Sequence, residues 1–269
     1  QTITIARPHF RKGTFYPTIM GKVKVKSTGR GATTINSDGD ARISYSRFNG
    51  YILHKVIKYK AKASENQGHT VIALDPGVRT FMTAYEPNKT ADIGNGAVIR
   101  IARLKNAQRN LLTKMKSVNA KKRKGMKKAY HKLGRKIQNL TDEMHWKTIR
   151  YIMKYDDIIL PNFAVKGMTK RSNPALGRIR KISKKTVSNM LLLQHYKFKM
   201  RLINKVKVSI DNRLFIVNES YTSKTCSSCG HEHIKLGSLK QFDCPNCSMS
   251  LDRDVNGARN IFMKYVHFN

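Results

Sequence analysis

Apolar and polar residues alternate along most of the first 70 residues. The runs TITIA, ARISYSRF and YILHKVIKYKAK follow this period of two, and glycines such as Gly31, Gly39 and Gly50 separate them. Successive side chains of a β-strand point to opposite faces, and glycine favours the turns between strands. Residues 1–70 are therefore predicted to form a small antiparallel β unit.

The run GKVKVKS in this unit places Lys22, Lys24 and Lys26 on the same face of a strand. Two interpretations stay open. Charged side chains on an edge strand discourage association with other strands, and a row of lysines also suits contact with phosphate groups.

The next segment predicts three adjacent strands. Two apolar runs flank a DPG turn in VIALDPGVRTFMTAYEP at 71–87, and GAVIRIARL at 96–104 supplies the third strand. Apolar residues then recur at spacings of three and four, which predicts that 101–140 is mostly helical. The KKRKG run at 121–125 is expected to divide this region into a helical hairpin.

Two further strands are predicted, DDIILPNF at 156–163 and RLFIVNE at 213–219. Between them, 166–185 has the Gly, Pro and Ser content of an irregular basic loop, and 186–206 is expected to be helical. Three strands followed by helix, strand, helix and strand predict an α/β fold with a mixed sheet and covered faces.

The net charge predicts the class of partner. The chain has 53 Lys and Arg against 16 Asp and Glu, a formal net charge of +37, which calls for a polyanion. A membrane surface is the competing polyanion, but no run of about 18 apolar residues exists and the basic residues are spread over the whole chain. Nucleic acid is therefore the expected partner, and a membrane is not. A solvated ribosomal-type basic protein remains an alternative within this class.

Four cysteines predict a metal site. Cys226, Cys229, Cys244 and Cys247 follow the spacing C-x2-C-x14-C-x2-C, in which two CxxC turns present four thiolates to one tetrahedral centre. A site closed by four thiolates has no open position for water, so we predict a structural zinc ion. Paired CxxC motifs in a chain of this length also favour a reducing, intracellular compartment over a disulfide framework.

Three acidic residues predict catalytic chemistry. Asp75 ends the apolar run VIAL, Glu219 ends LFIV, and Asp254 precedes the helical pattern VNGARNIFMKYV. Phosphodiester hydrolysis by two divalent ions uses carboxylates that converge from separate elements, and magnesium suits such an all-oxygen site. Each acid also has a structural explanation: a turn for the first, a lysine partner for the second and a helix N-cap for the third.

Several motifs together resemble a known family. LDPGVRTF at 74–81, YTSKTCSSCG at 221–230, the second CxxC and DRDVNGARNI at 252–261 resemble the transposon-encoded TnpB nucleases and their eukaryotic and viral relatives, the Fanzor proteins. The resemblance implies an RNase H-like (RuvC) mixed sheet with an inserted zinc ribbon and a preceding β-rich, wedge-like domain. It also implies an RNA-guided DNA endonuclease that binds a guide RNA (omega RNA) and cuts double-stranded target DNA.

The resemblance also implies a division of the chain into domains. Residues 1–70 would be the wedge-like domain, expected to be N-terminally incomplete because the chain starts at Gln1 without a Met. The nuclease domain would comprise 71–225, including a helical hairpin at 101–155, and 249–269. The zinc ribbon would occupy 226–248, between the two parts of the nuclease domain.

By motif, the resemblance makes Asp75 the first RuvC acid and Asp254 the last. TnpB proteins usually carry the middle glutamate at the end of the fourth strand, where this chain has Pro161. Some members, Fanzor proteins especially, have moved this glutamate to the neighbouring strand, and Glu219 fits that relocation. The expected magnesium-binding triad is therefore Asp75, Glu219 and Asp254. The departure favours a Fanzor-like identity, with a nuclear setting if the source is eukaryotic or viral and a cytoplasmic one otherwise.

Three alternatives stay open. The first is a catalytically inactive RNA-guided or DNA-binding transposon-associated protein, and the second is a transposase that joins strands. The third is a structural RNA-binding protein with a zinc ribbon, which accounts for the charge and the cysteines but leaves the three strand-end acids unexplained. The sequence carries no signal for the oligomeric state.

Overall fold

The computed structural model describes residues 2–11, 14–16, 37–47, 50–58, 69–163, 165–169, 172–173, 178–179, 182–218, 220–234, 236–237 and 239–268. The chain forms two compact units. The first comprises Gln1–Lys60 and Lys114–Arg135, and the second comprises Ala61–Thr113 and Lys136–Asn269.

The first unit contains the predicted antiparallel β structure. β1 (Thr2–Ile5), β4 (Ala41–Ser46) and β5 (Gly50–His54) form a sheet in the order β1-β4-β5, with antiparallel pairing throughout. Ile5, Phe10 and Ala41 are buried and form its small core. The short η1 (Arg7–His9), β2 (Phe10–Arg11) and β3 (Thr14–Phe15) follow β1. The run with Lys22, Lys24 and Lys26 lies outside the described residues.

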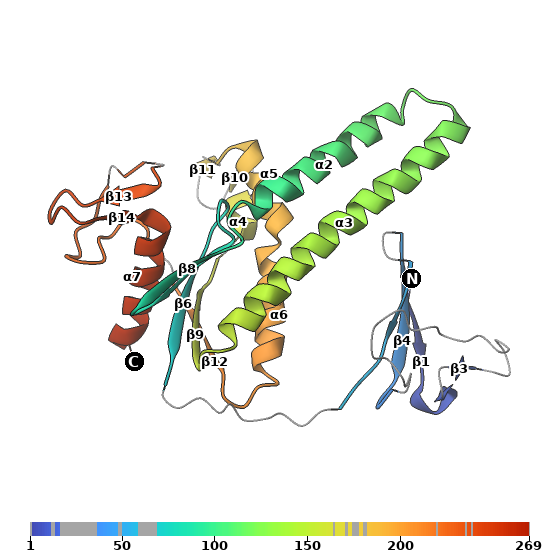
Figure 1. The fold of residues 1–269 in the computed structure, drawn as a ribbon, viewed down its shortest axis with the longest axis horizontal. Coiled ribbons are helices and arrows are strands. Elements are labelled where there is room, and N and C mark those ends of the chain that lie inside the picture. The colour runs from blue at the N-terminus through green and yellow to red at the C-terminus, as the bar shows by residue number, and fades with distance from the viewer. Residues whose placement is uncertain are drawn as a thin grey trace. The chain divides into compact units, whose positions relative to one another are not determined.

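A five-stranded mixed sheet forms the centre of the second unit (Figure 1). Its order is β12-β9-β6-β7-β8. The strands are β6 (Val71–Pro76), β7 (Met82–Glu86), β8 (Lys89–Ile93), β9 (Asp157–Pro161) and β12 (Arg213–Val217). β6, β9 and β12 are parallel to one another, whereas β6, β7 and β8 form an antiparallel meander. The predicted mixed α/β sheet is therefore confirmed.

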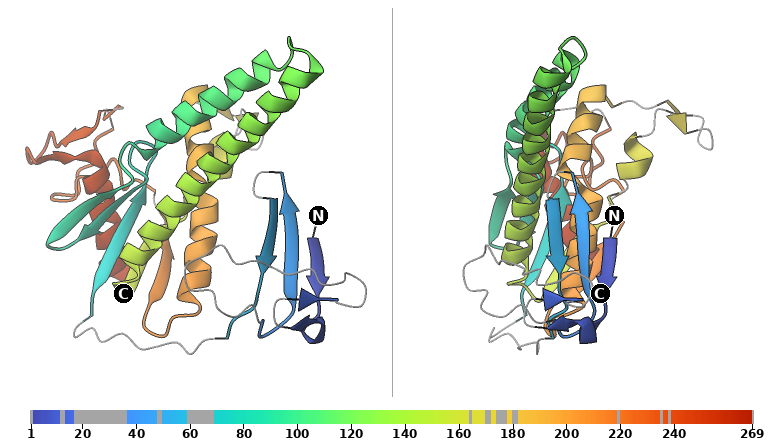
Figure 2. Two further views of the ribbon diagram at one scale, coloured as in Figure 1. Left: turned by 45° about the vertical axis from the view of Figure 1, so that its right-hand side comes forward. Right: turned by 90° about the vertical axis from the view of Figure 1, so that its right-hand side faces the viewer.

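Helices cover both faces of this sheet (Figures 1 and 2). On one face, Ile72 and Leu74 of β6 pack into a core with side chains of α2 (Ala97–Lys114), α3 (Ala120–Ile152), α5 (Lys184–Leu193) and α6 (His195–Val206). On the other face, Ala73 of β6 packs against α7 (Arg253–Phe268) through Ile261 and Phe262. Because strand side chains alternate, odd-numbered residues of β6 face α7, and Asp75 is one of them.

The remaining elements are short. α4 (Val165–Thr169), β10 (Ser172–Asn173) and β11 (Arg178–Ile179) lie in the segment predicted to be an irregular loop, so that prediction holds only in part. β13 (Gln241–Asp243) pairs with β14 (Ser250–Asp252) just before α7. Among the described helices, none is both long and apolar enough to cross a membrane.

The prediction of a strand at 96–104 is wrong. The third strand of the meander is β8, and GAVIRIARL forms the start of α2. Gly94 and Gly96 adopt left-handed backbone angles, with φ of 71° and 68°, and separate the strand from the helix. Val98 and Ile101 are buried at a helical spacing of three, whereas β8 is a mostly polar edge strand without a strong hydrophobic signal.

The helical hairpin forms, but the expected break at 121–125 is also wrong. α2 ends at Lys114, and α3 begins at Ala120 and includes the whole KKRKG run. Asn119 caps α3, because its side-chain oxygen accepts a 3.0 Å hydrogen bond from the backbone N–H of Lys122. Gly125 lies inside the helix, where a glycine costs only about 1 kcal/mol relative to alanine.

His145 lies fully buried in the core of the second unit. Its Nε2 donates a 2.8 Å hydrogen bond to the carbonyl oxygen of Leu193, and its Nδ1 lies 3.1 Å from an Arg201 nitrogen. This arrangement fits the neutral imidazole, with one ring nitrogen donating and the other accepting. Burial lowers the pKa of His145 to about 4, although the bond to Leu193 opposes the shift.

We predict that the second unit loses stability between about pH 6.5 and pH 4. In this window His145 is protonated in the unfolded chain but neutral in the folded chain. The free energy of unfolding therefore falls as the pH falls. The expected loss is on the order of 1–3 kcal/mol. Urea unfolding followed by the fluorescence of the neighbouring Trp146 at several pH values checks it. His145→Gln should make this pH dependence shallower, and an equal slope in both proteins would contradict the assignment.

Candidate active site

Asp75 lies near the carboxyl end of β6 on the face that α7 covers. In the sheet register, Asp75 pairs with Thr83 of β7, and Thr83 pairs with Asp92 of β8. Cross-strand partners point to the same face, so Asp75 and Asp92 both lie on the α7 side of the sheet. The Thr83 hydroxyl donates a 3.3 Å hydrogen bond to Asp92. The sheet thus carries two carboxylates in one row.

Asp254 enters the same region from the first turn of α7. Its backbone N–H donates a 2.8 Å hydrogen bond to the Asp252 carboxylate, which thereby satisfies a donor at the start of the helix. Burial raises the pKa of Asp254, and the Asp252 charge adds to the shift, while Lys240 and Arg79 oppose it. Ionisation of Asp254 therefore costs free energy in the folded chain, and a bound cation would reduce this cost.

Gly257 lets α7 approach Asp75 closely. A Cβ atom at this position would lie 2.5 Å from an Asp75 carboxylate oxygen and 3.7 Å from the Ser223 hydroxyl. The first distance is shorter than any normal contact, so a larger residue would displace the carboxylate. The glycine of the DRDVNGARNI motif is thus needed for the position of the first predicted acid.

Two of the three predicted acids, Asp75 and Asp254, line one cavity of about 410 Å³. Asp75 and Asp254 share it with three basic side chains and with Phe163, Leu239, Thr222 and Ser223. The basic residues are Arg79, Lys240 and Arg253. Asp252 holds Lys240 through a 3.1 Å ion pair. The structure therefore brings Asp75 and Asp254 together, whereas Glu219 lies outside the described residues.

Two asparagines of α7 fix the segment that precedes the cysteines. Asn256 is fully buried; its side-chain oxygen accepts a 3.0 Å hydrogen bond from the Ser227 N–H, and its amide donates a 2.8 Å bond to the Thr225 carbonyl. Asn260 donates to the carbonyls of Thr222 and Thr225 at 2.8 and 2.7 Å. These bonds join α7 to the 222–227 segment, which lines the cavity through Thr222 and Ser223.

The four cysteine sulfur atoms lie within 4.8 Å of one another. Cys226 lies 3.6 Å from Cys247, and Cys229 lies 3.6 Å from Cys244. A tetrahedral zinc site with bonds of about 2.3 Å has sulfur atoms about 3.8 Å apart, so the cluster has the dimensions of a zinc ribbon site. Asn246 donates a hydrogen bond to Cys229 and lowers the pKa of that thiol.

The two CxxC turns have the same backbone geometry. In each turn, the carbonyl of the first cysteine accepts a 3.0 Å bond from the residue after the second cysteine, Gly230 or Ser248. Both of these residues are left-handed, with φ of 76° and 58°. The first cysteine of each turn also donates a 2.8 Å bond, to His231 or Met249. Because the two turns share this geometry, two segments that are distant in the sequence present matching pairs of thiols.

Sequence reasoning did not assign several residues that build this site. Gly257, Asn256 and Asn260 belong to the DRDVNGARNI motif, and their spacing within it was the available signal. Asp92 lies in a polar strand that the sequence did not predict. Its position in the same row as Asp75, with Thr83 between them, follows from the sheet register alone.

The chain is similar to several known proteins. Residues 195–261 match the family described as Cas12f1-like, TNB domain. A TnpB-like protein of Acanthamoeba polyphaga mimivirus is 31% identical over 270 residues, which cover 96% of this chain and 48% of that protein. A putative RNA-guided DNA endonuclease of Streptomyces pristinaespiralis is 24% identical, over 71% of this chain and 44% of that protein. The chain thus spans about half the length of the curated relatives that it matches.

The fold also has a counterpart among solved structures. Cas12f1 in its complex with sgRNA and target DNA superposes with a TM-score of 0.51 at 17% identity, over 83% of this chain and 45% of that one. The sheet order and the cysteine ribbon thus place the second unit in the class of RuvC-containing, RNase H-like folds. Over nearly its whole length, the chain is thus similar to TnpB-like proteins.

We predict that Asn256→Ala loosens the junction between α7 and the cysteine ribbon. The substitution leaves the Ser227 N–H without its buried partner and removes one of the two hydrogen bonds to the Thr225 carbonyl, at a cost of about 1–3 kcal/mol. Hydrogen exchange of the Ser227 amide should accelerate about 5- to 150-fold, which corresponds to that range. Asn139→Ala replaces an exposed asparagine of α3 and is the matched control. Unchanged protection of Ser227 in the Asn256 variant would contradict the role of this side chain.

Proposed function

We propose that this chain is the nuclease part of an RNA-guided DNA endonuclease that hydrolyses phosphodiesters by two-metal-ion RuvC chemistry. The observation that supports this most is the convergence of Asp75 and Asp254 on one cavity with three basic side chains. The names of its relatives agree with this activity, since one is described as a putative RNA-guided DNA endonuclease.

The acidic residues fit divalent cations. Asp75 and Asp254 offer the oxygen ligands that magnesium prefers, and the raised pKa of Asp254 marks a carboxylate whose charge lacks sufficient compensation. When bound, magnesium would activate water and stabilise the charge that develops on the phosphate. Gly257 keeps the neighbouring helix from displacing Asp75.

The basic residues of the cavity suit a phosphate group. Arg79, Lys240 and Arg253 surround the acidic pair, and Lys240 is held by Asp252 on the strand that leads into α7. Arg253 donates to the carbonyl of Gly237 at 2.9 Å, which anchors it to the ribbon. These side chains would orient the DNA backbone, while Phe163 and Leu239 add apolar surface to the cavity wall.

Glu219 is proposed as the middle acid. In the sheet, Val217 of β12 pairs with Pro161 of β9, and extending the register of β6 and β9 by two residues sets Asp75 opposite Pro161. Position 161 therefore neighbours Asp75, and a proline there offers no carboxylate. Glu219 follows Val217, the last residue of β12, by two positions in the sequence, and Val217 packs on the α7 face of the sheet. This relation supports the relocated glutamate and the Fanzor-like identity.

The cysteine cluster is proposed to bind zinc. Its sulfur separations match a tetrahedral site, and the metal would supply a large part of the folding free energy of so small a module. Because Asn256 and Asn260 join this region to α7, a folded ribbon would also support the cavity that contains Asp254.

Guide RNA and double-stranded target DNA are the proposed partners. The net charge of +37 suits a large polyanionic assembly, and the similar Cas12f1 fold was solved with sgRNA and target DNA. Base pairing between guide and target would supply the sequence specificity, so this chain would contact mainly the backbone.

We predict that cleavage of DNA depends on each of the three acids. The full-length protein is co-expressed with its native locus, the copurified RNA is sequenced, and cleavage of matching DNA is measured with magnesium. Asp75→Asn, Glu219→Gln and Asp254→Asn should each reduce cleavage at least 100-fold, the scale on which loss of a catalytic electrostatic group acts. Bound RNA without cleavage by the wild type would favour the catalytically inactive alternative. Full cleavage by Glu219→Gln would show that another group is the middle acid.

We predict that cleavage also depends on the absence of a side chain at Gly257. Gly257→Ala should displace the Asp75 carboxylate and reduce cleavage at least tenfold, while stability changes by no more than about 1 kcal/mol, because alanine favours the helix. Gly125→Ala is the matched control, since a Cβ at this exposed position of α3 meets nothing within 4 Å. Cleavage rates and urea unfolding are measured for both. Equal cleavage by the two variants would refute the role of Gly257.

A further inference from the structure

A second cavity of about 570 Å³ adjoins the candidate active site on the other face of the sheet. Pro76 and Phe163 line both cavities, and Pro76 directly follows Asp75. The volume lies within the range of about 300–1,000 Å³ that is typical of sites for small organic groups. None of the acidic and basic residues of the candidate active site lines this second cavity.

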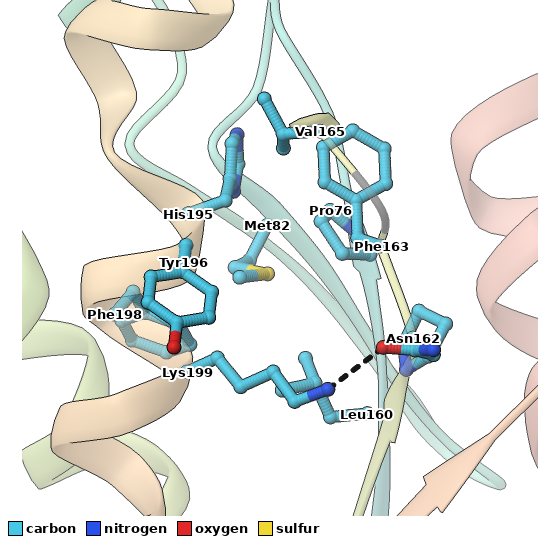
Figure 3. A pocket seen from close by; sticks show the side chains of 11 residues that line it. Pro76, Met82, Leu160, Asn162, Phe163, Val165, His195, Tyr196, Phe198 and Lys199 are labelled. Atoms are coloured by element: carbon cyan, nitrogen blue, oxygen red, sulfur yellow. Dashed lines mark hydrogen bonds between the residues drawn. The ribbon is translucent and has the colours of Figure 1, made fainter. Parts of the chain in front are cut away.

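Most of the cavity wall is apolar or aromatic (Figure 3). Met82 and Leu160 form the inner wall, and Phe163 and Tyr196 lie on opposite sides of the hollow (Figure 3). Tyr196 is 71% exposed, so the cavity opens to solvent beside an aromatic ring. Planar, partly apolar groups stack favourably on such side chains.

His195 is the buried polar group of this cavity. Only 4% of it is exposed, and neither ring nitrogen has a hydrogen-bond partner among the described residues. The ring stacks on Phe81 at a centroid distance of 4.9 Å, and the edge contact with Phe163 is 5.0 Å. Burial lowers the pKa of His195 to about 4, with the Gly77 backbone opposing the shift without reaching hydrogen-bond geometry. The neutral ring offers one donor and one acceptor.

A second polar group lies on the opposite side of the cavity. Lys199 donates a 2.8 Å hydrogen bond to the side-chain oxygen of Asn162, as the dashed line in Figure 3 shows. This bond orients the Asn162 amide so that its NH₂ group remains a donor at the rim. The cavity therefore combines aromatic walls with donors and an acceptor at defined places, and buried polar groups normally have partners.

On the basis of the proposed function, we propose that this cavity binds an unstacked nucleobase of the DNA strand whose phosphate enters the Asp75–Asp254 site. A base is planar and carries both donors and acceptors on its edge, which matches the aromatic walls and the His195 ring. The two cavities share Pro76 and Phe163, so a strand with its phosphate in one has an adjacent base within reach of the other. Holding this base would fix the position of the scissile phosphate.

The test measures binding of single-stranded DNA to the full-length protein with its copurified RNA, without added magnesium. A series of oligonucleotides carries an abasic sugar at one position at a time along the whole strand. One position should weaken binding by about 5- to 150-fold, the range expected for loss of one base stacked on an aromatic side chain. Tyr196→Ala should weaken binding of the intact strand similarly, and should cause no further loss with that abasic strand.

Three variants define the outcome. Tyr196→Phe retains the stacking ring and should bind like the wild type. Leu191→Ala removes an exposed apolar side chain of the preceding helix that does not line the cavity, and should have no effect. Val165→Trp fills the cavity and should abolish the difference between intact and abasic strands. If the wild type shows no position-specific abasic effect, or if Tyr196→Ala and the abasic sugar act independently, the proposal is overturned.

The result also separates this proposal from the proposed function. Binding is measured without cleavage, so a position-specific effect in a protein that does not cut DNA would support the base site and contradict the nuclease. Cleavage by a protein with no position-specific effect would support the nuclease and overturn the base site.

Discussion

The close approach of α7 to the central sheet is the constraint on which the candidate active site depends. Asp75 belongs to the sheet and Asp254 to the helix, so the two carboxylates share a cavity only if the elements pack tightly beside them. Gly257 permits this contact, because any Cβ at its position would meet the Asp75 carboxylate. Ile261 and Phe262 continue the contact along the apolar part of the sheet.

The same helix connects the cavity to the cysteine ribbon. Asn256 and Asn260 satisfy backbone groups of the segment between Thr222 and Ser227, and this segment contributes both a wall of the cavity and the first cysteine. Buried asparagines with several hydrogen bonds hold a loop in one conformation more firmly than apolar contacts do. The cysteine cluster and Asp254 are thereby linked through one short helix segment.

The carboxyl edge of the sheet separates two chemical environments. On the α7 face, acidic and basic groups suit a phosphate and cations, whereas on the other face aromatic residues and a neutral histidine suit a base. Pro76 and Phe163 lie at the boundary between them. A strand bound across this edge would present its backbone to one side and a base to the other.

The sequence by itself predicted the mixed α/β fold class, the grouping of the four cysteines, and Asp75 and Asp254 as two acids that come together. Strongly apolar strands such as β6 and β9, and CxxC pairs at fixed spacing, carry local signals that do not depend on the rest of the chain. It did not determine β8, since an edge strand buries little apolar surface, nor the start of α2, where the pattern fitted a strand and a helix equally. Only the tertiary structure decided that Gly257 meets Asp75, that Asp92 lies in the same row, and that His195 faces a cavity. These relations join residues far apart in the sequence, and they arise from strand register and helix packing, which no local pattern encodes.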